Sequence, residues 1–76
     1  MIREFNSAEQ SSTIHSSSYD TETRLLTVHF KHGVSYIYKQ VPLEKYEEFE
    51  AADSKGTAFR NLFYNIYEYT KLSHNI

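Results

Sequence analysis

Apolar and polar residues alternate most clearly between Arg24 and Phe30. Leu26, Val28 and Phe30 fall at every second position, with polar side chains between them. Because successive side chains of a β-strand point to opposite faces, this spacing predicts a strand with one buried side. These three residues therefore mark one apolar face of a sheet.

A second strand is predicted over residues 34–38, where β-branched and aromatic residues follow one another. His32 and Gly33 precede it and favour a turn, so the two strands form a hairpin. The sequence leaves the register open. A two-residue turn puts Tyr36 and Tyr38 on the side opposite the apolar face, whereas a three-residue turn with Gly33 in a bulge puts them on the core side.

Two helices are predicted after Pro42, which suits the first turn of a helix because it has no N–H group. The first spans residues 42–52, where apolar residues recur at three-residue steps. Ser54 is a candidate N-cap for the second helix. That helix carries apolar residues at helical spacing on one face: Phe59, Leu62, Phe63 and Ile66.

Strands therefore come first and helices second, without strand–helix alternation. This order predicts an α+β fold in which a small antiparallel sheet of about three strands is followed by two helices packed on one face. The polar start of the chain is expected to be loose, or to form a short edge strand that begins near Ser11.

Composition excludes several functional classes. The 76 residues include seven Tyr and five Phe but no Cys, which excludes disulfide scaffolds, thiolate metal sites and cysteine nucleophiles. No apolar run is long enough for a membrane span or a signal peptide, so we expect a cytoplasmic protein with no membrane partner. Since so short a chain has few residues outside its core, we expect binding rather than catalysis.

Charge is distributed unevenly, although the formal net charge is only −2. Acidic residues crowd the first predicted helix and its end: Glu44, Glu47, Glu48, Glu50 and Asp53. The stretch 24–42 has no acid and holds several basic or imidazole side chains: Arg24, His29, Lys31, His32 and Lys39. Cations bind phosphates and aromatic rings stack on bases, so this hairpin is a candidate RNA or nucleotide site. Protection of an edge strand is the alternative role of its cations.

The start of the second predicted helix is a further candidate site. Ser54, Lys55 and Gly56 combine a hydroxyl, an ammonium group and free backbone N–H groups at the positive end of a helix dipole, which suits an anion. The alternative is plain capping by Ser54, with Gly56 needed for close packing against the sheet. The two roles are compatible.

No residue set indicates a metal or a reaction. His29 and His32 lack a third ligand at a recognisable spacing, so we expect no metal. The motifs of nucleotide hydrolases, serine hydrolases, metalloproteases and dinucleotide-binding enzymes are absent from the sequence. We therefore expect no catalytic residues and no cofactor.

The order of these motifs resembles the KTSC family, a short domain found at the C-terminus of some lysyl-tRNA synthetases and as small bacterial and phage proteins. The resemblance runs from Ser11 to about Tyr69. It rests on the following motifs together: Ser11-Ser12-x-Ile14, Tyr19-Asp20, Leu26-x-Val28-x-Phe30 with Gly33, Tyr36-x-Tyr38, Val41-Pro42 with Tyr46, and Ser54-x-Gly56 with Phe59. With it we expect a flexible segment over residues 1–10, the domain over residues 11–70 and a tail over residues 71–76.

The resemblance implies an RNA-binding role, and the chain departs from the family at two places. The family's aromatic-aromatic-Asn run after the glycine is Ala58-Phe59-Arg60 here, and a family arginine is replaced by Tyr64. Arg60 offers a positive charge at a position next to the altered one.

We therefore expect a non-catalytic module for RNA or a nucleotide. Arg24, His29, Lys31 and Lys39 would contact phosphate while Tyr36 or Tyr38 stacks, and residues 54–56 with Arg60 would form a second anion contact. Phage members suggest an alternative, a protein that sequesters a small nucleotide signal. The other alternative is a protein-interaction adaptor that uses the acidic first helix or the tyrosines Tyr64, Tyr67 and Tyr69. A homodimer stays open.

Overall fold

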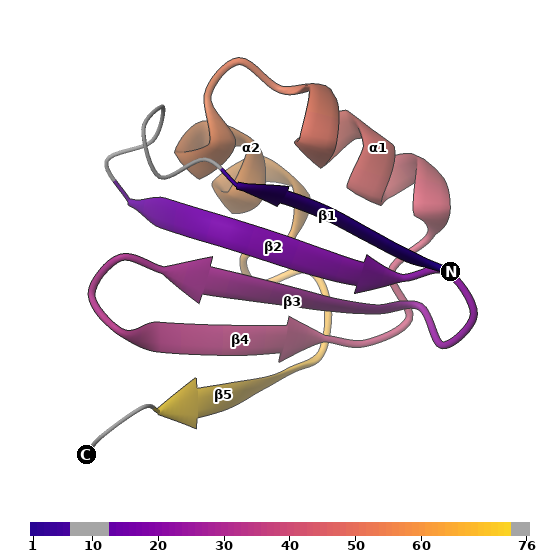
Figure 1. The fold of residues 1–76 in the computed structure, drawn as a ribbon, viewed down its shortest axis with the longest axis horizontal. Coiled ribbons are helices and arrows are strands. Elements are labelled where there is room, and N and C mark those ends of the chain that lie inside the picture. Colours follow the sequence, from indigo (N-terminus) through magenta and orange to yellow (C-terminus); the bar gives the residue numbers. More distant parts are fainter. Residues whose placement is uncertain (7–12, 74–76) are drawn as a thin grey trace.

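The computed structural model describes residues 1–6 and 13–73. Five strands form one antiparallel sheet in the order β1-β2-β3-β4-β5, and both helices lie between β4 and β5 in the chain (Figure 1). The elements are β1 (Ile2–Asn6), β2 (Ile14–Asp20), β3 (Leu25–Phe30), β4 (Val34–Tyr38), α1 (Leu43–Ala51), α2 (Lys55–Leu62) and β5 (Tyr69–Ser73).

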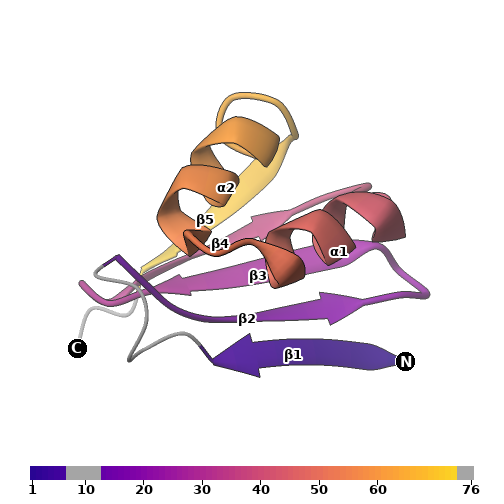
Figure 2. The ribbon, with the colours of Figure 1, turned by 90° about the horizontal axis from the view of Figure 1, so that it is seen from above.

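The fold is α+β, as predicted, and both helices lie on the same side of the sheet (Figure 2). The prediction of about three strands is wrong, because the two edge strands were missed. Residues 2–6 form β1 rather than a loose segment, and the predicted tail supplies residues 71–73 of β5. The expected strand start at Ser11 lies outside the described residues. Edge strands can remain polar and exposed, so their sequences carry little alternation.

The three-residue turn is the one that forms between β3 and β4. Val28 pairs with Tyr36, and Leu26 pairs with Tyr38. Gly33 has a φ of 91°, and its N–H donates to the carbonyl of Phe30 at 3.1 Å. Because paired residues point to the same face, both tyrosines lie on the core side.

Aromatic rings fill the space between the sheet and the helices. The Phe49 ring of α1 lies 5.1 Å from the Phe5 ring of β1 and 5.2 Å from Phe63, which follows α2. Tyr46 stacks on Tyr19 with ring centroids 4.8 Å apart. These rings are buried, apart from the half-buried Phe5, so the helices are held mainly by burial of aromatic surface.

The turn between β2 and β3 is stabilised by Asp20. Its Oδ1 accepts a hydrogen bond from the N–H of Glu22 at 2.9 Å, and this and further bonds from Thr23 hold the pKa of Asp20 below its usual value. Asp20 therefore stabilises the turn through its side chain. Among the described residues, no helix is both long and apolar enough to cross a membrane.

Candidate binding surface

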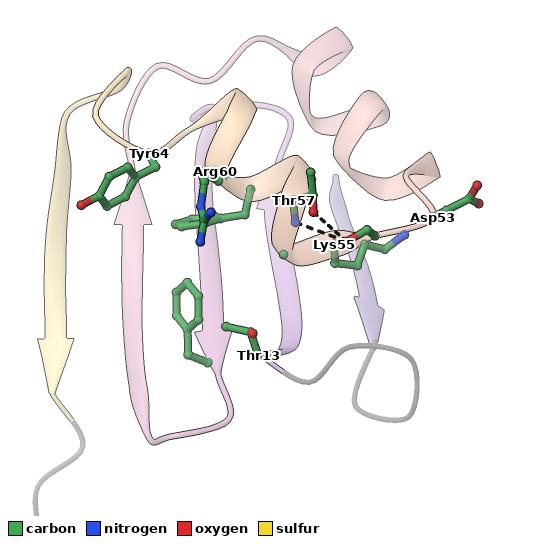
Figure 3. A pocket seen from close by; sticks show the side chains of 10 residues that line it. Thr13, Asp53, Lys55, Thr57, Arg60 and Tyr64 are labelled. Atoms are coloured by element: carbon green, nitrogen blue, oxygen red, sulfur yellow. Dashed lines mark hydrogen bonds between the residues drawn. The ribbon is translucent and has the colours of Figure 1, made fainter.

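A cavity of about 730 Å³ lies beside the start of α2 (Figure 3). Residues 53–57 line it at the helix start, and Thr13 lies across from them (Figure 3). Phe30 of β3 also lines it. Phe59, Arg60 and Tyr64 complete it. We call this space the α2 cavity; it brings together all four candidate residues of the second anion contact, namely Ser54, Lys55, Gly56 and Arg60.

Ser54 caps α2, as predicted. Its Oγ accepts a hydrogen bond from the N–H of Thr57 at 3.4 Å and lies 3.1 Å from the Thr57 hydroxyl. Close packing at Gly56 is not observed, because a Cβ there would meet only the Thr13 Oγ1, at 4.0 Å. The small residue therefore leaves the helix start open toward the α2 cavity.

Lys55 directs its ammonium group away from this cavity. Its Nζ donates to the carbonyls of Glu50 at 2.8 Å and Ala52 at 2.6 Å, at the end of α1, and lies 5.1 Å from the centre of the Phe5 ring. Figure 3 shows the side chains of Lys55 and Asp53 pointing away from Arg60. Lys55 therefore joins α1 to α2 and does not supply the cavity with charge.

Arg60 is the cation that reaches the α2 cavity. Its exposed side chain extends from α2 over the sheet, and the Tyr64 ring lies beside it on the side of β5 (Figure 3). Within the described part of the chain, the Arg60 guanidinium forms no hydrogen bond or ion pair. A charged group in this state is free to bind an anionic ligand.

Next to the cavity, β4 and β5 present further rings that the helices do not cover. Tyr36 is half-buried, and its ring lies 5.5 Å from Phe30 and 5.3 Å from Tyr69. Lys71 pairs with Tyr36 in the sheet and so shares its face. We call Tyr36, Tyr69 and Lys71 the β5 surface.

Tyr38 takes no part in this surface. Its side chain is only 2% exposed and packs on Phe59 and Phe63. Burial raises the pKa of Tyr38 above its usual value. Of the two hairpin tyrosines, only Tyr36 is therefore in a position to meet a ligand.

The remaining hairpin candidates do not lie together. Arg24 and Lys39 are at one end of the hairpin, where the Lys39 Nζ is 4.0 Å from Glu68. Lys31 is at the other end, beside Thr13 and thus close to the α2 cavity. His29 points to the face without helices, where its Nδ1 lies 2.7 Å from the Ser35 hydroxyl.

Sequence reasoning did not include Phe30, Tyr64, Tyr69 or Lys71 among the ligand-binding candidates. Tyr69 lies at the end of the predicted domain and Lys71 in the predicted tail, and only the pairing of β5 with β4 brings them beside Tyr36. The short alternation of tyrosines and polar residues from Tyr67 to Thr70 is the signal that could have identified the start of this strand. Among the described residues, no three His, Asp or Glu side chains are grouped as a metal site would require.

Comparisons with known proteins agree on one family. The KTSC domain matches residues 10–70. An uncharacterized protein of Stutzerimonas stutzeri is 41% identical over 56 residues, which cover 74% of this chain and 79% of that protein. A lysine–tRNA ligase of Trichormus variabilis is 38% identical over 55 residues, which cover 72% of this chain but only 10% of the ligase.

A solved structure matches the whole arrangement. The crystal structure of a KTSC domain protein from Yersinia pestis superimposes with a TM-score of 0.84 at 27% sequence identity, over 96% of this chain and all of the other. That match includes the region of β1 and β5, which the sequence resemblance did not predict as strands. The sequence match over most of the chain and this shared fold lead to one conclusion: the chain belongs to the KTSC domain family.

Proposed function

We propose that this domain is a non-catalytic cytoplasmic module that binds RNA or a nucleotide at the α2 cavity. The observation that carries the proposal is Arg60, an unpaired cation among the described residues, which lies beside the exposed Tyr64 ring in a cavity that Phe30 also lines. A guanidinium binds phosphate through a planar set of donors, and an aromatic ring stacks on a base. The cavity combines both kinds of contact.

The start of α2 supports the same ligand class. The Ser54 side chain accepts a hydrogen bond from the N–H of Thr57. The N–H groups of Lys55 and Gly56 lie in the first turn, before the hydrogen bonds between successive turns of the helix begin. Such groups favour an anion, and Gly56 leaves the approach to them open. Lys31 lies at the same end of the sheet. In this proposal Arg24, Lys39 and His29 lie away from the ligand.

Equilibrium binding tests the proposal. A fluorescein-labelled eight-nucleotide uridine RNA and AMP are titrated at low and moderate salt, by anisotropy and tyrosine fluorescence respectively. Arg60→Glu should lower the affinity for either ligand by about tenfold or more, because it replaces a phosphate contact with a repulsive charge. Arg24→Glu is the matched control, since it makes the same charge change at the far end of the hairpin.

An absence of binding to both ligands at low salt would overturn the proposal. So would equal losses in the Arg60→Glu and Arg24→Glu variants, because a loss independent of position indicates only nonspecific attraction. A preference for AMP that depends weakly on salt would instead support the nucleotide-sequestering form of the proposal.

A protein-interaction adaptor is the second candidate, and exposed apolar residues near the C-terminal strand favour it. Tyr64, Ile66 and Tyr69 are 57%, 58% and 49% exposed. The acidic helix α1 is a weaker candidate surface, because Glu47 and Glu50 already pair with Arg3. If nucleic acid does not bind, Ile66→Asp is the variant to compare with the wild-type protein in partner capture.

A further inference from the structure

The aromatic surface does not end at the α2 cavity but continues to the edge of the sheet. The Phe30 ring contacts Tyr36, and the Tyr36 ring contacts Tyr69, both edge to face. Tyr69 is 49% exposed, although it packs on Tyr36 and Tyr38. A ligand that leaves the cavity toward β5 would therefore meet a second set of rings.

This second region has its own cation. Lys71 is exposed and lies directly opposite Tyr36 on the helix side of the sheet. Within the described residues its ammonium group forms no hydrogen bond or ion pair. Glu68, the acidic residue nearest to it in sequence, faces Lys39 at the other end of β4. The β5 surface thus repeats the composition of the α2 cavity, with rings and one unpaired cation.

We infer that the ligand is a single-stranded polynucleotide, which places one nucleotide at the α2 cavity and a neighbouring nucleotide on the β5 surface. This inference rests on the proposed function. A mononucleotide would use Arg60 and the α2 cavity alone. A single-stranded polynucleotide would use both Arg60 and Lys71 for successive phosphates and both ring surfaces for unstacked bases. A duplex hides its bases and fits this surface poorly.

The test compares the affinities of the uridine octamer and of AMP for the same protein variants. Lys71→Glu should lower the affinity for the uridine octamer by about tenfold and the affinity for AMP much less. Lys71→Gln should reduce the slope of log affinity against log salt by about 0.7, the value for one lost phosphate contact on a single strand. Lys45→Glu, on α1, is the matched control and should leave octamer binding unchanged.

The ring contribution is tested at Tyr69. Tyr69→Phe keeps the ring and should retain octamer binding, whereas Tyr69→Ser should weaken it by about fivefold or more. Thermal unfolding of both variants shows whether β5 still packs. If Tyr69→Ser unfolds, the octamer affinities of Lys71→Glu and Lys45→Glu decide whether the β5 surface takes part in binding, since both positions are exposed.

Three outcomes would overturn the inference and leave the proposed function valid. AMP could bind as tightly as the octamer, Lys71→Glu could leave octamer affinity unchanged, or duplex RNA could compete as well as the single strand. Failure of both ligands to bind would overturn the proposed function itself. The inference would be supported if the octamer binds more tightly than AMP and if Lys71→Glu and Tyr69→Ser both weaken octamer binding.

Discussion

In the half of the molecule that contains β1 and α1, the cations Arg3 and Lys55 have partners within the chain. Arg3 of β1 pairs with Glu47 and Glu50 and lies 5.8 Å from the Tyr46 ring centre, while Lys55 donates to carbonyls at the end of α1. On the side of α2 and β5, Arg60 and Lys71 have no such partners among the described residues. We call these the β1–α1 side and the α2–β5 side.

The tyrosines differ in the same way. Tyr19 and Tyr46 stack on each other in full burial on the β1–α1 side, whereas Tyr64 and Tyr69 are exposed on the other. Identical residue types therefore hold the fold together in one place and remain available in another. Tertiary neighbours, rather than composition, decide which of the two roles a residue has.

The largest expected difference between the two sides is in core packing. Phe49→Ala should lower the free energy of unfolding by about 3–5 kcal/mol, because the buried ring contacts both Phe5 and Phe63. Tyr64→Ala should change it by less than about 0.5 kcal/mol, because that ring is exposed. Urea unfolding measures both. Similar values for the two variants would remove the distinction between the sides.

A smaller effect separates the two stacked tyrosines. Tyr19→Phe should cost about 1–3 kcal/mol, because the Tyr19 hydroxyl donates to the buried carbonyl of Val41. Tyr46→Phe should be neutral or slightly stabilising, because the Tyr46 hydroxyl is buried without a hydrogen-bond partner among the described residues. The same urea measurement applies. A large cost for Tyr46→Phe would mean that its hydroxyl has a partner in solution.

Alkaline unfolding should report on Tyr38, which is buried on the α2–β5 side against Phe59, Phe63 and Tyr69. Burial, with smaller contributions from Tyr36 and Tyr69, raises the pKa of Tyr38 above its ordinary value of 10.0. The unfolded chain therefore loses this proton first, so the stabilisation is complete below about pH 10 and is lost as the pH rises further. Tyr38→Phe should make the alkaline loss shallower by up to about 1.4 kcal/mol per pH unit. An unchanged slope in unfolding measured above pH 10 would contradict this.

The smallest effect concerns the cations themselves. Arg3→Gln should lower the thermal midpoint by a few degrees at most, because the side chain is partly exposed and its ion pairs are screened. Arg60→Gln should leave the midpoint unchanged but weaken RNA binding, and Arg3→Gln should show the reverse pattern. Loss of binding in both variants would contradict the assignment of separate roles.

The central part of the fold was predictable from the sequence because its patterns are local. Alternation at Leu26, Val28 and Phe30 identified β3, and Ser54 identified the start of α2. The edge strands were missed because most of their residues with a described side chain are exposed, so their sequences carry little apolar alternation. The register of the hairpin depends on one turn residue, and the sequence allowed both choices.

The candidate site was predictable only where its residues are close in sequence. Ser54, Gly56 and Arg60 do meet in the α2 cavity. The role of Lys55 was not visible, because its acceptors are backbone carbonyls that appear only when α1 ends beside it. Lys71 was missed because it reaches Tyr36 only through pairing between distant strands.

β5 differs from its neighbours in how the chain reaches it. A short turn joins β2 to β3 and another joins β3 to β4, but both helices intervene between Tyr38 and Tyr69. Closing this longer loop costs more conformational entropy, and β5 has a partner on one edge only. We therefore expect β5 amides to exchange with solvent faster than those of β3, through local opening. Each opening would separate Lys71 from Tyr36, so a single-stranded polynucleotide bound across both positions would slow exchange in β5.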